Sequence, residues 1–101
     1  MPDASDNTLE MVKKDLRNIM AAQEVYQMEY GGYAPDWIAL QYATGNRLSS
    51  GNVAEVVGDT TGYKATVRSD GTRAVSRRCS VHCGTAAEFA GKESLRIEVD
   101  P

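Results

Sequence analysis

Apolar positions near the N-terminus recur every three or four residues, which is the spacing of one face of an α-helix. The residues of this helix packing stripe are Leu9, Val12, Leu16, Ile19, Tyr26 and Tyr30, with Gln23 in register and Met20 at its border. Glu10, Lys14 and Arg17 fall outside the stripe. The pattern predicts one long amphipathic helix over residues 7–30, about 36 Å long at about 1.5 Å per residue.

Both ends of this helix carry local signals. Asn7 followed by Glu10 is typical of a helix start, because the Asn side chain can accept a backbone hydrogen bond there. Gly31 and Gly32 predict the end of the helix, and Pro35 prevents renewed helical growth. A helix of this length exceeds what a small sheet can cover, so its first turns either project beyond the sheet or fray.

The rest of the chain alternates between apolar and polar residues, as half-buried strands do. Residues 36–51 predict a short helical turn and then a connecting loop. Strands are expected over 53–57, 63–68, 74–81 and 95–99, with a hairpin turn at 69–72, where Asp-Gly favours an antiparallel return. A loop is expected from 84 to 94. The order predicts a single α+β domain over residues 1–101, with one long N-terminal amphipathic helix packed on a three- or four-stranded antiparallel sheet in residues 52–101.

The net charge of −3 gives no overall attraction to nucleic acid or to anionic lipid. Five cations nevertheless concentrate in one segment with a single acid, Asp70. They are Lys64, Arg68, Arg73, Arg77 and Arg78. We call residues 64–78 the basic hairpin. It is a candidate contact for DNA or another polyanion, with weak and salt-sensitive binding, or else an ordinary solvated strand face.

Several function classes leave no signature in the sequence. There is no glycine-rich nucleotide fingerprint, no phosphate-binding loop and no nucleophile elbow. The carboxylates do not form a calcium-loop motif. We therefore expect neither an enzyme nor a cofactor or metal site. No apolar run approaches the roughly 20 residues that cross a bilayer, and the first residues lack the layout of a secretion signal.

Cys79 and Cys83 leave more than one interpretation open. In a continuous strand they would lie about 13 Å apart, whereas a disulfide needs Cα atoms within about 7 Å. A bridge between them therefore requires a turn at residues 80–82. The alternatives are two free thiols, or a zinc site that includes His82.

One stretch of the helix has a recognisable succession of motifs. It reads Asp15-Leu-Arg-Asn, then Ala22-Gln-Glu, then Tyr26, then Gly31-Gly-Tyr-Ala. This succession resembles the helix that carries the globular head of bacterial type IV pilins and pseudopilins. The resemblance continues in Gly62-Tyr63-Lys-Ala65-Thr66 and in Cys79-Ser-Val-His-Cys83-Gly84. Such pilins often pair a Cys in this strand with one near the C-terminus, but the tail here has no Cys, and export favours oxidation of the two that are present.

The resemblance implies a pilin-like head domain without the family's N-terminal hydrophobic segment. It implies a structural subunit of a type IV pilus or pseudopilus-like extracellular filament, for adhesion, motility or secretion, that assembles through its N-terminal helix. The implied partners are copies of itself or other pilins, with the membrane reached through an upstream segment. Met1 is then an added start or a residue within the native helix. The implied location is a cell-surface filament, exported via the inner membrane. Some minor pilins bind DNA, which is the alternative role for the basic hairpin.

Overall fold

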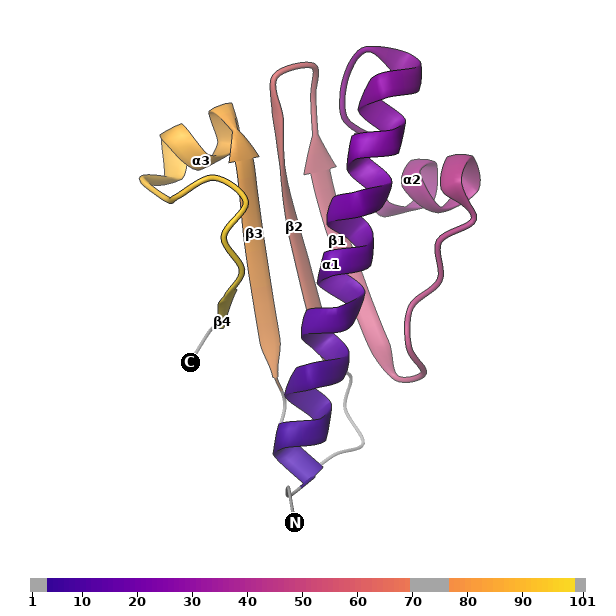
Figure 1. Cartoon of the computed structure of the whole chain (residues 1–101), viewed down its shortest axis with the longest axis vertical. Helices are drawn as coiled ribbons and strands as arrows, with labels where there is room; N and C mark the ends of the chain where they lie inside the picture. The colour runs from indigo at the N-terminus through magenta and orange to yellow at the C-terminus, as the bar shows by residue number, and fades with distance from the viewer. Residues whose placement is uncertain (1–3, 70–76, 100–101) are drawn as a thin grey trace.

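One long helix lies across one face of a four-stranded antiparallel sheet (Figure 1). The structure is a computed structural model that describes residues 4–69 and 77–99. The helices are α1 (Ala4–Tyr30), α2 (Trp37–Thr44) and α3 (Thr85–Ala90). The strands are β1 (Asn52–Gly58), β2 (Gly62–Ser69), β3 (Arg78–Gly84) and β4 (Glu98–Val99). The predicted α+β architecture is therefore confirmed.

Helix α1 spans Ala4–Tyr30, so it starts three residues before the predicted range 7–30. Neither Gly nor Pro interrupts residues 4–30, which lets the helix run for 27 residues, or about 40 Å. It ends where the glycine pair predicts. Gly31 adopts a left-handed φ of 77°, and its N–H donates to the Gln27 carbonyl at 2.9 Å.

The strands follow one another in the order β1-β2-β3-β4, and every neighbouring pair is antiparallel. In the hairpin between β2 and β3, Arg68 lies opposite Arg78 and Tyr63 opposite Cys83. The predicted turn at Asp70-Gly71 and the first residues of the predicted third strand lie outside the described residues. Of the predicted strand 95–99, only Glu98–Val99 pairs with β3.

The core lies between α1 and the facing side of the sheet. Val12, Leu16 and Ile19 of α1 have no exposed surface. Alternate strand residues meet them, because successive side chains of a strand point to opposite faces. These core residues are Val56, Tyr63, Ala65, Val67, Cys79, Val81 and Cys83, joined by Ala34 and by Leu40 of α2.

Two helices occupy segments where the sequence predicts little helix. Residues 36–51 contain α2, capped by the Asp36 carboxylate, which accepts from the Ala39 N–H at 2.8 Å. The predicted loop over 84–94 contains α3, which ends at a left-handed Gly91. The loop prediction over this stretch is wrong because the two turns of Thr85–Ala90 are too short to show helical periodicity.

Strand β1 forms one edge of the sheet, and the chain itself covers both ends of that edge. The N–H of Asn52 donates to the Ser49 carbonyl at 3.0 Å, and the N–H of Gly58 donates to the Pro35 carbonyl at 3.3 Å. Both bonds point away from β2, so the connecting segments occupy hydrogen-bonding positions that an added strand would use. In residues 4–69 and 77–99, no helix combines the length and the apolar character needed to span a bilayer.

Candidate functional site

The helix packing stripe divides into a buried part and an exposed end. Val12, Leu16 and Ile19 are fully buried, whereas Leu9 and Tyr26 are partly buried against the core. Tyr30 departs from the expectation, because 59% of its surface is exposed. Its ring lies 4.5 Å from that of Tyr26, centroid to centroid. The last residue of the stripe therefore belongs to the molecular surface rather than to the core.

Asp15 is a buried carboxylate on α1 that the sequence analysis does not single out. It is 2% exposed and accepts three hydrogen bonds. Ser49 donates through its backbone N–H at 2.8 Å and through its hydroxyl at 2.9 Å, and the Asn52 side chain donates at 2.7 Å. Asp15 thus fixes the start of β1 against the first half of α1. The sequence indicates this burial only through the position of Asp15 between Val12 and Leu16, on the apolar side of the helix.

Gln23, further along α1 toward its C-terminal end, also fixes a later segment of the chain against the helix. It is fully buried, its side-chain oxygen accepts from the Ala34 N–H at 2.8 Å, and its amide donates to the Ala34 carbonyl at 3.3 Å. These two bonds satisfy the backbone of a buried connecting residue. Gln23 therefore holds the segment that follows α1 against the helix.

An open cleft of about 290 Å³ lies beside this segment, at the end of the molecule where α1 ends. We call it the tyrosine cleft. Its lining residues are Tyr26, Tyr30, Gly32, Tyr33, Pro35, Gly58, Asp59 and Thr60. Three tyrosines and one aspartate thus line a single hollow, and Asp59 also lines a second hollow beside α3. Such a lining suits a cation, because aromatic faces and carboxylates both attract positive charge.

The carboxylate of the tyrosine cleft is held in place by the β1–β2 turn. Asp59 Oδ1 accepts from the Thr61 N–H at 2.8 Å, from the Thr61 hydroxyl at 2.9 Å and from the Gly62 N–H at 3.0 Å. The Thr61 bonds lower the pKa of Asp59 and keep it ionised. All three bonds use one oxygen, and Oδ2 has no hydrogen-bond partner among the residues that the structure describes.

Tyr33 connects the tyrosine cleft to the core. Its ring lies 5.0 Å from that of Tyr63, and its hydroxyl oxygen lies 3.7 Å from the Cys83 sulfur, within hydrogen-bond distance. The hydrogen bond with Cys83, followed by burial, raises the pKa of Tyr33 to about 12. Tyr63 is 1% exposed, and its hydroxyl has no partner within the described part of the chain. Ionisation of Tyr33 therefore requires a higher pH than that of an ordinary tyrosine, whose pKa is 10.0.

The basic hairpin does not present its five cations as one cluster. Lys64, Arg68 and Arg78 are exposed on the face of the sheet opposite α1, with Arg68 directly across from Arg78. Arg77 is half-buried, and its backbone N–H donates to the Ser69 hydroxyl at 2.9 Å. Arg73 lies outside the described residues. A hollow of about 230 Å³ brings Arg68 and Arg78 together with Glu55, so the exposed cations share this face with an acid.

Cys79 and Cys83 are both free and buried. They lie on one continuous strand, paired with Val67 and Tyr63 respectively, without the turn that a bridge between them requires. The candidate disulfide is therefore wrong. His82 alternates to the other face of the strand. No group of three or more potential metal-binding side chains occurs in residues 4–69 and 77–99, so a zinc site at this segment has no support there.

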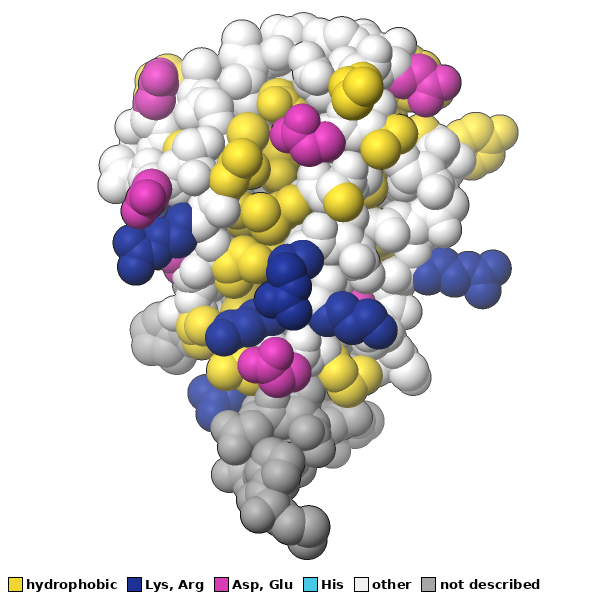
Figure 2. Space-filling view, in the orientation of Figure 1, with side chains coloured by type: hydrophobic (Ala, Val, Ile, Leu, Met, Phe, Trp, Pro, Cys, Tyr) yellow, Lys and Arg dark blue, Asp and Glu magenta, His cyan; other side chains and the backbone are white. Residues whose placement is uncertain are grey.

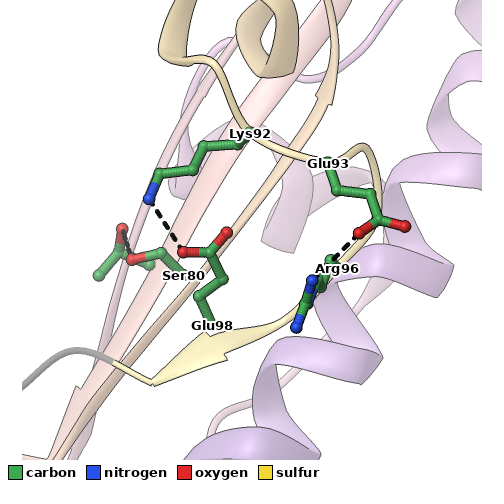
Figure 3. Close-up of polar contacts among 6 residues, drawn as sticks. Ser80, Lys92, Glu93, Arg96 and Glu98 are labelled. Atoms are coloured by element: carbon green, nitrogen blue, oxygen red, sulfur yellow. Dashed lines mark hydrogen bonds and ion pairs between the residues drawn. The ribbon is translucent and has the colours of Figure 1, made fainter.

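The C-terminal segment is fastened to β3 mainly through its backbone. The Leu95 N–H donates to the His82 carbonyl at 2.8 Å. Lys92 pairs with Glu98 at 3.0 Å and Arg96 with Glu93 at 3.1 Å, as Figure 3 shows. Exposed ion pairs of this kind contribute at most about 1 kcal/mol each. These charges are already paired within the chain and are weaker candidates for a binding site.

A comparison of the chain with protein-family models, curated proteins and solved structures finds no match.

Proposed function

We propose that this chain is the globular part of a structural subunit of an extracellular filament of the type IV pilus or pseudopilus kind. In this proposal it assembles through its N-terminal helix with copies of itself or with related subunits, and the filament serves adhesion, motility or secretion. The proposal rests on the motif succession from Asp15 to Ala34 together with one geometric observation, the extent of α1.

Helix α1 is much longer than the sheet that it covers. Its 27 residues span about 40 Å, whereas strands of seven or eight residues span about 25 Å. The N-terminal end of α1 extends past the lower edge of the sheet in Figure 1. A helix that leaves its own head at one end is suited to pack among the helices of neighbouring subunits. This supports a subunit role better than it supports a self-contained binding domain.

The outward side of α1 also suits such packing. Val25 is 54% exposed and Met28 81% exposed, and Ala21 completes an apolar row at helical spacing. Glu10, Lys14 and Arg17 continue the same side toward the N-terminal end. One face of α1 thus packs on its own sheet, and the other presents apolar and charged groups to solvent.

The decisive experiment begins with the coding sequence immediately upstream of Met1. The proposal requires a short basic leader, a Gly cleavage point and an apolar segment with Glu at its fifth position. An antibody raised against this chain should then label filaments in electron micrographs and should detect the protein in material sheared from the cell surface. Absence of the leader, or retention of all the protein inside the cells, would contradict the proposal.

A second function, polyanion binding through the basic hairpin, has one observation in its favour. Arg68 and Arg78 face each other on the open side of the sheet, beside a hollow large enough for a phosphate group. The variant Arg78→Gln should lower retention on heparin and weaken its salt dependence. The matched variant Arg47→Gln removes an exposed cation elsewhere and should not. Equal retention of both variants and the unmodified protein would exclude this function.

A further inference from the structure

The tyrosine cleft has the chemistry of a receptor for a cationic side chain. Tyr26, Tyr30 and Tyr33 supply aromatic surface, and Asp59 supplies a fixed negative charge with one oxygen unused by the turn. An ammonium or guanidinium group near such rings is attracted by their π-faces, and the carboxylate adds a direct Coulomb attraction. The hollow beside Glu55, Arg68 and Arg78 has no aromatic residue in its lining, and the hollow between Lys64 and α3 has one, Phe89.

The end of the molecule that carries the tyrosine cleft is acidic. We call it the upper end, as it lies in Figure 1, and it holds the last turns of α1, the β1–β2 turn and α3. Exposed acidic residues there and in the adjoining start of α2 are Glu24, Glu29, Asp36, Asp59 and Glu88. Lys64 lies toward this end but on the opposite face of the sheet, and Lys92, which follows α3, is paired with Glu98.

The opposite half of the molecule is rich in cations. Asp15 holds Ser49 and Asn52 beside the first half of α1, which places the preceding Arg47 in this half as well. Its described cations are Lys13, Lys14, Arg17, Arg47, Arg68, Arg77 and Arg78, with Glu10 among them. Figure 2 shows part of this polarity on the α1 side, where Asp and Glu but no Lys or Arg side chains lie in the uppermost part, and the Lys and Arg side chains lie around the middle and below it.

Lys14 and Arg17 are the cations best placed to reach another molecule. Both are exposed on the outward side of α1, and neither has an ion-pair partner among residues 4–69 and 77–99. They cannot fill the cleft of their own chain. Arg17 precedes Tyr30 by 13 positions on one straight helix, which separates them by about 20 Å. Lys14 and Arg17 can therefore reach such a cleft only on a second molecule.

We propose that the tyrosine cleft binds Lys14 or Arg17 of a second copy of this chain, so that copies associate in a staggered, head-to-tail row. The inference rests on the proposed filament function for its biological setting, and it specifies one contact between subunits. The two surfaces in contact are different, so the association is heterologous. A free cleft and a free basic face remain at the ends of each row, and the row can grow.

The test uses two complementary variants. The basic-face variant, Lys14→Gln with Arg17→Gln, keeps the cleft and removes the cations on exposed helix positions. The cleft variant, Asp59→Asn with Tyr30→Leu, keeps the basic face. Asn retains the oxygen that accepts the turn hydrogen bonds, and Tyr30 is largely exposed, so the fold should be preserved. Circular dichroism melting curves check that both variants are folded.

Sedimentation velocity at low salt measures the association. The average mass of the unmodified protein should rise with concentration and fall when salt is added. Each variant alone should remain monomeric, but an equal mixture should form dimers, because one variant supplies the cleft and the other the cations. Tyr30→Leu alone should weaken the association about two- to fivefold. Glu88→Gln and Arg47→Gln, which change charge at the same ends outside the contact, should associate like the unmodified protein.

Three results would overturn the inference. They are an unmodified protein that stays monomeric at every concentration, a basic-face variant that associates undiminished, and a mixture that stays monomeric while the unmodified protein associates. The filament proposal is judged separately, by the upstream sequence and the sheared fraction. A protein found in surface filaments but monomeric in this assay would therefore refute the cleft contact and leave the filament function standing.

Discussion

Replacing Asp15 with alanine removes the acceptor of three hydrogen bonds at once, and we expect it to be among the most destabilising changes on the surface of α1 that faces the protein. The carboxylate is 2% exposed, and its donors are the Ser49 N–H, the Ser49 hydroxyl and the Asn52 amide. Alanine leaves these donors facing an apolar methyl group.

The size of the effect follows from the number of donors left unpaired. An unsatisfied buried donor costs about 1–3 kcal/mol. The lower value applies here because the donors are only partly buried and water reaches them, and because loss of a buried charge relieves some desolvation. Three donors then give a loss of about 3 kcal/mol in the free energy of unfolding. For a domain of this size, that lowers the melting temperature by about 12 to 24 °C.

Asparagine at this position should cost less, about 2 kcal/mol, because it keeps one acceptor oxygen but turns an NH₂ group toward the remaining donors. Urea unfolding followed by circular dichroism measures both changes, with an unchanged slope as the check on two-state behaviour. Glu10→Ala, an exposed acid on the same helix, should stay within about 0.5 kcal/mol of the unmodified protein.

A double-mutant cycle with Asn52→Ala separates the hydrogen bond from the general effect of the substitution. If the carboxylate fixes the start of β1, the two changes should couple by at least about 0.5 kcal/mol. The reasoning is refuted if Asp15→Ala costs less than about 1 kcal/mol, which is below the expected loss from even one unpaired donor.

Three further outcomes are expected. Gln23→Ala should lower the free energy of unfolding by about 2 kcal/mol, because both hydrogen bonds to the Ala34 backbone are lost. A change below about 0.5 kcal/mol in urea unfolding would contradict the proposal that Gln23 holds this segment against α1. Tyr33 should ionise near pH 12 in an ultraviolet titration. Its contribution to stability should be intact below pH 10.0 and should be lost as the pH rises from there through about 12, because the phenol of the unfolded chain releases its proton first. Titration of every tyrosine near pH 10.0 would contradict this. Cys79 and Cys83 should react with a thiol reagent only on unfolding, with two thiols counted under non-reducing conditions; a single disulfide, or rapid reaction of the folded protein, would oppose the burial described.

Local spacing accounts for the parts of the fold that sequence predicts. A period of three to four residues places Val12, Leu16 and Ile19 on the buried side of α1, and strict alternation does the same for Tyr63 and Val67 on β2. These patterns depend on near neighbours in the chain. They predict the helix and the strands, and together these elements give the α+β architecture.

Contacts between distant residues lie beyond such patterns. Asp15 meets Ser49 across 34 positions and Asn52 across 37, and its charge alone predicts an exposed residue. The tyrosine cleft likewise joins the end of α1 to a turn after β1. The cysteines could be assigned only once β3 was seen to stay extended, because the sequence permits a turn at residues 80–82. The missed helix α3 has only six residues, which is too short a window to show helical periodicity.

The edge of the sheet has a consequence for how this protein behaves when many copies are crowded together. The carbonyls of Ser49 and Pro35 accept from the outward N–H groups of Asn52 and Gly58 at the two ends of β1. Because the N–H groups of an antiparallel strand alternate between its two sides, only Ala54 and Val56 have peptide groups that face outward between these ends. That length is too short to template a new strand. At this edge a close neighbour can therefore be recognised only through side chains, and the β1 edge is protected from the β-aggregation that exposed sheet edges nucleate.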